Sequence, residues 1–234
     1  MNINNCCCRD IPYSFNQLYS KEVIEDNNFY YPNYINSSYQ HQSDGYLRHD
    51  KPIKNITFLK LNNELRRLWE EHIVWTKLTI MALASNAPDT KFVTNRLLKN
   101  ADDFGHLFAF FYDQSIAEQF KNLISDHLTI ATDLVVAAKK GDNNSVKIID
   151  NKWHENANNI SKFMSNINPY FNEIEIRNMF YNHLALTKNE AVAILNNKYE
   201  EAIKLFDEIE IQALTMSNMF LEGFTKHFSN QIIR

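Results

Sequence analysis

The chain has 234 residues, of which 44% are hydrophobic, and it carries a formal net charge of −4 with a pI near 6.1. Four glycines and five prolines are too few for an all-β protein with many tight turns, or for glycine-rich phosphate loops. The negative net charge provides no basic field that would attract a phosphate backbone. Composition therefore favours a helical protein with one good core and argues against nucleic acid as a partner.

Residues 1–57 are predicted to form a disordered arm, because they are rich in Asn, Tyr, Ser and Asp without a helical or strand period. Its tyrosines could dock on a partner or on the body of the fold; the alternative is a tolerated tail. The three cysteines of the chain, Cys6, Cys7 and Cys8, are adjacent and have no distant cysteine to pair with. They could bind a soft metal or cross-link two chains.

The start of the chain lacks a basic region followed by an apolar one, and no run approaches the roughly 18 apolar residues that span a bilayer. Together with the cysteine usage, this predicts a cytoplasmic protein without a membrane partner.

From Leu59 onward the apolar residues recur at helical spacing, and residues 58–230 are predicted to form a helical bundle. Capping signals divide it, among them Pro88-Asp89, a capping box at Ser115 with Glu118, Gly141-Asp142, and Pro169 with Asn172 and Glu175. An Asn196-Asn197 pair is expected at the last bend. The predicted fold is all-α: three antiparallel helical hairpins formed by 60–86 with 89–112, 115–140 with 143–167, and 173–196 with 198–228.

One pattern occurs three times along these hairpins, which indicates a diverged internal repeat. His72, His127 and His183 each lie in the apolar stripe of a first helix, at spacings of 55 (127 minus 72) and 56 (183 minus 127). Since all three share the apolar face, their imidazoles are expected to point inward.

The repeat also includes a polar residue on the second helix of each hairpin. Asn100 and Asn156 each precede the next histidine by 27 residues, since 127 minus 100 and 183 minus 156 agree. In the third copy the expected counterpart is Glu208. Asn100 could alternatively be a helix N-cap with Asp103 at N3.

These residues predict an internal pocket, and three imidazoles with one carboxylate suit a divalent metal such as zinc, iron or manganese. The expected metal ligands are His72, His127, His183 and Glu208. Asn100, Asn156 and Glu190 are expected to bind a ligand in the same pocket. The Glu-x-x-His motif of ferritin-like dimetal bundles is missing, because the residues three before the histidines are Trp69, Ile124 and Phe180.

Residues 65–228 resemble an uncharacterised bacterial family of all-helical proteins, some members of which carry an acetylglutamate kinase label. The stretches that carry the resemblance are 68–76, 95–104, 125–131, 166–170 and 207–214. The resemblance implies an all-helical fold; the label implies a nucleotide-dependent amino-acid kinase. That kinase fold would need glycine-rich turns, whereas Gly45, Gly105, Gly141 and Gly223 are isolated here.

The function predicted from the sequence is binding of a metal ion or small polar ligand in the histidine pocket. The alternative is a non-enzymatic structural or interaction protein whose buried polar residues satisfy one another. No catalytic residue is assigned, since no serine has the G-x-S-x-G context of a nucleophile. A homodimer stays open, because an exposed face of one hairpin could pair two copies.

Overall fold

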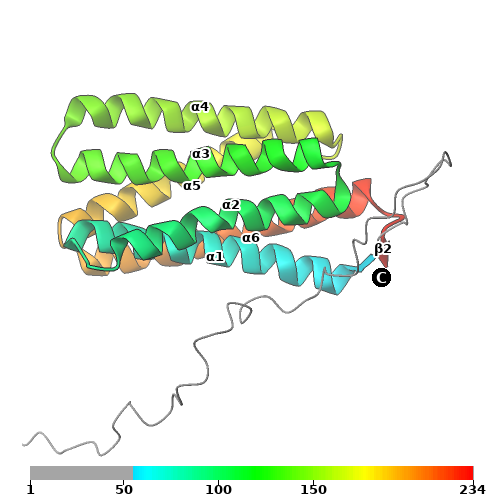
Figure 1. Cartoon of the computed structure of the whole chain (residues 1–234), viewed down its shortest axis with the longest axis horizontal. Helices are drawn as coiled ribbons and strands as arrows, with labels where there is room; N and C mark the ends of the chain where they lie inside the picture. Colours follow the sequence, from blue (N-terminus) through cyan, green and yellow to red (C-terminus); the bar gives the residue numbers. More distant parts are fainter. Residues whose placement is uncertain (1–54, 234) are drawn as a thin grey trace, which may run out of the picture. The chain divides into compact units, whose positions relative to one another are not determined.

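The computed structural model describes residues 55–233, and six long helices make up most of that range (Figure 1). The predicted arm, with Cys6, Cys7 and Cys8, lies outside the described residues except for its last three positions. The helices are α1 (Phe58–Ser85), α2 (Thr90–Phe111), α3 (Gln114–Lys139), α4 (Asn143–Ile167), α5 (Glu173–Leu195) and α6 (Tyr199–His227). The prediction of an all-α bundle is confirmed, with helix boundaries close to the expected ones.

Consecutive helices lie side by side and are joined by short connections, at 86–89, 112–113, 140–142, 168–172 and 196–198. Connections of this length make neighbouring helices antiparallel. Helix α6 also packs against α1, so the six helices close into a ring. Within the ring α1, α3 and α5 contact one another. The helices that carry the three histidines therefore meet at the centre of the bundle.

The turn residues explain where the helices begin and end. The side chains of Asp142 and Asn172 accept backbone N–H groups at the starts of α4 and α5, as expected from the sequence. Gly141 and Asn197 adopt the left-handed conformation that ends the preceding helices, with φ of 71° and 58°. One cap was predicted wrongly: α3 starts at Gln114, and the cap is Asp113, which accepts from the N–H of Ile116 at 2.9 Å.

Both ends of the described chain meet in a short parallel pair, β1 (Ile56–Thr57) with β2 (Ile232–Ile233). Residues 56 and 57 were assigned to the arm from the sequence, but here they belong to this pair. Ile56 and Ile232 are both buried, so the pair extends the core at one end of the bundle.

Bulky aromatic side chains fill the part of the bundle on one side of the histidines. Phe108 and Phe120 stack with ring centroids 3.7 Å apart, and Trp69 lies edge-on to Phe104 and Phe220. On the other side lies a second, smaller cluster of mostly short side chains: Ile80, Val135, Ala191, Ala193, Ile194 and Ala202. Trp153 of α4 is also buried and its ring centroid lies 5.3 Å from that of His127, so the aromatic residues are concentrated on one side of the histidines without being confined to it.

None of the six helices in the described range combines the length and the hydropathy that crossing a bilayer requires.

Gly223 marks a close approach between α6 and the connection before α5. A Cβ at this position would lie 2.1 Å from Cε1 of the buried Phe171. Gly223→Ala is therefore expected to lower the free energy of unfolding by about 3 kcal/mol, because the ring has to shift within a packed core. Urea denaturation measures the change. Gly141→Asn is the control: nothing lies within 4 Å of its Cβ and Asn tolerates positive φ, so an equal loss there would contradict the steric explanation.

Candidate functional site

The three repeated histidines converge inside the bundle, one each from α1, α3 and α5. His72, His127 and His183 are 3%, 1% and 2% exposed. Their ring centroids are 5.5 to 6.1 Å apart, and one ring nitrogen from each lies within 4.8 Å of the other two. The sequence prediction that the histidines share one interior point agrees with this geometry.

Each imidazole contacts a carboxamide from the second helix of its own hairpin through Nδ1. The Nδ1–oxygen distances are 2.9 Å for His72 with Asn100, 3.0 Å for His127 with Asn156, and 3.1 Å for His183 with Gln212. All three amides are buried. The partner helices α2, α4 and α6 therefore orient the three rings in the same way.

The other end of each carboxamide determines which ring nitrogen carries the proton. The amide nitrogens of Asn100, Asn156 and Gln212 donate to the carbonyls of the residues four before the histidines: Leu68 at 3.0 Å, Leu123 at 2.9 Å and Met179 at 3.0 Å. A carbonyl can only accept, so the amide NH₂ faces it and the amide oxygen faces the imidazole. Nδ1–H then donates to that oxygen. Each Nε2 is left with a lone pair.

The environment keeps these rings neutral. Burial lowers the pKa of His72 to about 4, and burial together with proximity to His72 lowers the pKa of His183 to about 3. Burial, together with the other two imidazoles, holds the pKa of His127 well below its usual range. At neutral pH the three side chains are therefore unprotonated at Nε2, which is the form that binds metals.

The sequence prediction that Glu208 is the counterpart of Asn100 and Asn156 in the third hairpin, and a metal ligand, is wrong. Glu208 is exposed on α6, and Gln212, one helical turn later, contacts His183 instead. A different count would have found it: the amide follows the histidine of its own hairpin by 28 residues in the first copy and 29 in the other two. The interval of 27 residues from each asparagine to the histidine of the next hairpin could not be applied to the third hairpin, because no further hairpin follows it.

Asn100 lies in the middle of α2, fully buried, so it is not a helix N-cap. Asn100 and Asn156 both belong to the site, as partners of the imidazoles.

Glu190 is buried on α5, and its carboxylate is not part of the group of three converging nitrogens. The Lys77 ammonium lies 3.4 Å from its Oε1. Burial raises the pKa of Glu190 to about 7, although Lys77 acts in the opposite direction.

The three imidazoles could hold a metal ion. Nitrogens 4.8 Å apart at most would place a central ion no more than about 2.8 Å from each, whereas Zn–N bonds are about 2.0–2.1 Å. Binding would draw each ring inward by less than about 1 Å, which a side-chain adjustment can supply. Comparisons with protein-family models, with curated proteins and with solved structures give no significant match.

Proposed function

We propose that this protein binds one divalent transition-metal ion through the Nε2 atoms of His72, His127 and His183. The observation that carries the proposal is the carboxamide that holds each ring with its proton on Nδ1. A second hydrogen bond of this kind fixes the tautomer and raises the basicity of histidine ligands in metal sites.

A self-satisfied polar network accounts less well for the same atoms. Hydrogen-bond acceptors cannot satisfy one another, and Nε2 of His127 is buried without a hydrogen-bond partner among the described residues. An unsatisfied buried polar atom costs on the order of 1–3 kcal/mol. A central cation satisfies three lone pairs at once.

The ligand set favours zinc over manganese. Imidazole suits zinc, copper, iron and nickel, whereas manganese prefers oxygen ligands. In the described residues the converging group contains three histidines and no carboxylate, so it also differs from the two-histidine, one-carboxylate triad of non-haem iron enzymes. Three nitrogen ligands would leave a fourth position of a tetrahedral zinc for water or a small anion.

Zinc loading followed by gel filtration and elemental analysis tests the proposal. We expect about one zinc per chain, and loss of that zinc in His127→Ala, because two remaining imidazoles bind far more weakly. His154→Ala is the matched control, since His154 is a partly exposed histidine of α4 that contacts Asp150. Zinc retained by His127→Ala, or absent from the unmodified protein, would contradict the proposal.

A small polar cation is the second candidate, favoured by three ring nitrogens that converge on one point. A centre no more than about 2.8 Å from each nitrogen allows N–H hydrogen bonds, and ammonium carries enough donors for three acceptors. Calorimetric titration with ammonium chloride tests this alternative. Potassium chloride is the control, because potassium has the same charge and no hydrogen to donate.

A further inference from the structure

The bundle interior differs on the two sides of the histidines. On the side toward the starts of α1, α3 and α5, bulky apolar residues precede them by three positions: Trp69, Ile124 and Phe180. On the other side, the positions four later hold Thr76, Ala131 and Thr187, and those seven later hold Thr79, Leu134 and Glu190. Residues at these spacings share one helix face and follow one another at about 5 Å intervals. Except for Leu134, the side chains at these positions are small or polar, and we refer to Thr76, Thr79, Ala131, Thr187 and Glu190 as the column.

Several polar atoms of this column are buried without a hydrogen-bond partner in the described part of the chain. They are the hydroxyls of Thr79 and Thr187 and Oε1 of Glu190. Natural proteins keep few such atoms, because each costs free energy comparable to a lost hydrogen bond. All three atoms belong to the column, so an ion that moved along it could be coordinated by each of them in turn.

Lys77 connects this buried column with the surface. Its ammonium contacts Glu190 Oε1 at 3.4 Å and lies 3.8 Å from the ring centre of Phe206 on α6. The Lys77 side chain is 21% exposed, whereas that of Glu190 is 2% exposed. At 3.4 Å the contact is longer than the roughly 2.7–2.9 Å typical of a charge-assisted hydrogen bond, and a cation that replaces the ammonium would keep the buried carboxylate paired.

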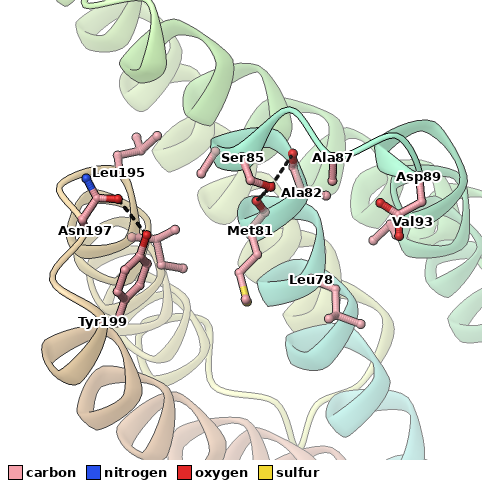
Figure 2. A pocket seen from close by; sticks show the side chains of 12 residues that line it. Leu78, Met81, Ala82, Ser85, Ala87, Asp89, Val93, Leu195, Asn197 and Tyr199 are labelled. Carbon is pink, nitrogen blue, oxygen red and sulfur yellow. Dashed lines mark hydrogen bonds between the residues drawn. The ribbon is translucent and has the colours of Figure 1, made fainter. Parts of the chain in front are cut away.

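Beyond Glu190, a surface groove of about 400 Å³ opens between the last turns of α1 and α5 (Figure 2). Ile194, one turn after Glu190, lines it from α5, and Met81, one turn after Lys77, lines it from α1. Figure 2 shows Met81 and Tyr199 facing each other across the groove. Solvent thus reaches within one turn of the buried ion pair.

We propose that the column from this groove through Lys77 and Glu190 to Thr187 and Thr79 is the route by which a cation reaches the three histidines. The inference rests on the proposed metal site. In this route the Glu190 carboxylate coordinates an ion that has lost part of its water shell, and the hydroxyls of Thr187 and Thr79 coordinate it next. Lys77 controls entry, because its ammonium is paired with the carboxylate until the incoming cation displaces it. On the aromatic side, the residues three before the histidines, Trp69, Ile124 and Phe180, have no oxygen atom in their side chains.

Stopped-flow mixing with cobalt(II), which absorbs visible light when tetrahedrally bound, measures the rates of uptake and release. We expect Glu190→Gln to slow both by about tenfold, because a relay lowers the barrier in both directions and leaves the dissociation constant nearly unchanged. Lys77→Met is expected to accelerate both, since it removes the competing ammonium. Thr187→Val, which keeps the side-chain shape and removes the hydroxyl, is expected to slow them.

Lys188→Met is the matched control. Lys188 lies on α5 two residues before Glu190, but its ammonium pairs with Asp150 of α4 at 3.1 Å, away from the column. Wild-type rates in both Glu190→Gln and Lys77→Met would overturn the route while leaving the metal site in place. The route would also be overturned if Glu190→Gln raised the dissociation constant through faster release alone, with an unchanged rate of uptake. That result would indicate that Glu190 acts on the bound ion through its charge at a distance. Absence of cobalt uptake by the unmodified protein would overturn the metal site itself.

Discussion

Lowering the pH from 7 to 4 is expected to unfold the metal-free bundle. The three histidines are neutral in the folded state, with a pKa of about 4 for His72, about 3 for His183, and well below the usual value for His127. In the unfolded chain they titrate near 6.5, so between these values the unfolded state binds more protons. The stability that they contribute is complete above pH 6.5 and is lost as the pH falls toward the folded pKa values.

The size of this effect is large for a single domain. The shift of His72 alone corresponds to on the order of 3 kcal/mol, against a typical total of about 5–15 kcal/mol. Glu190 acts with the opposite sign: its raised pKa of about 7 means that its contribution is complete below about pH 4.5 and lost as the pH rises through 7. Acidification therefore restores part of the stability through Glu190, but one carboxyl group does not offset three imidazoles.

Circular dichroism during acid titration, with urea unfolding at each pH, measures the transition. The double variant His127→Leu with Asn156→Leu is the control, because it removes one imidazole together with its amide and leaves no new unpaired group on either side chain. Its stability should fall less steeply between pH 6.5 and 4. A wild-type unfolding free energy that stays constant over this range would show that the imidazoles are not buried as neutral groups.

Zinc is expected to raise the free energy of unfolding by about 4 kcal/mol when its free concentration is a thousand times its dissociation constant. The gain arises because the three imidazoles converge only in the folded chain. It should also move the acid transition to lower pH, since protons and metal compete for the same Nε2 atoms. Thermal and urea unfolding with and without zinc measure both shifts.

The same double variant separates a metal site from a structural network. If the histidines serve only to fix helix packing, zinc should stabilise the wild-type protein and His127→Leu/Asn156→Leu equally, through weak surface binding. The metal proposal expects the gain to vanish in the variant while its metal-free stability stays near that of the wild type. Magnesium, which prefers oxygen ligands, serves as the control ion.

Much of this architecture could be predicted from the sequence, because helix periods and caps are local signals. The six helices, the inward histidines and the amides Asn100 and Asn156 were all identified from spacing. The cap at Asp113 was missed because Ser115 with Glu118 gives a similar pattern two residues later. The exact helix start depends on which of two nearby side chains accepts the free backbone N–H groups of the first turn, and it can differ by one or two residues from the predicted start.

Gln212 and Lys77 were missed for a different reason. Gln212 differs from the asparagines by one methylene and lies within a run of acidic and apolar residues, so the more conspicuous Glu208 was chosen in its place. Lys77 approaches Glu190 from another hairpin, and no spacing along the chain predicts a contact between α1 and α5. Such contacts follow from how the ring of helices closes, which is a tertiary property.

The position of Glu190 illustrates what joining the three hairpins in one chain makes available. In a symmetric assembly of three identical hairpins, an acid at this site would occur three times around the axis, and three buried carboxylates would repel one another strongly. Here the equivalent positions hold Thr79 and Leu134, so only one copy carries the charge. Because the three hairpins belong to one chain, one of them can carry a buried acid that the other two lack. A homotrimer of identical hairpins could not place an acid in one copy alone.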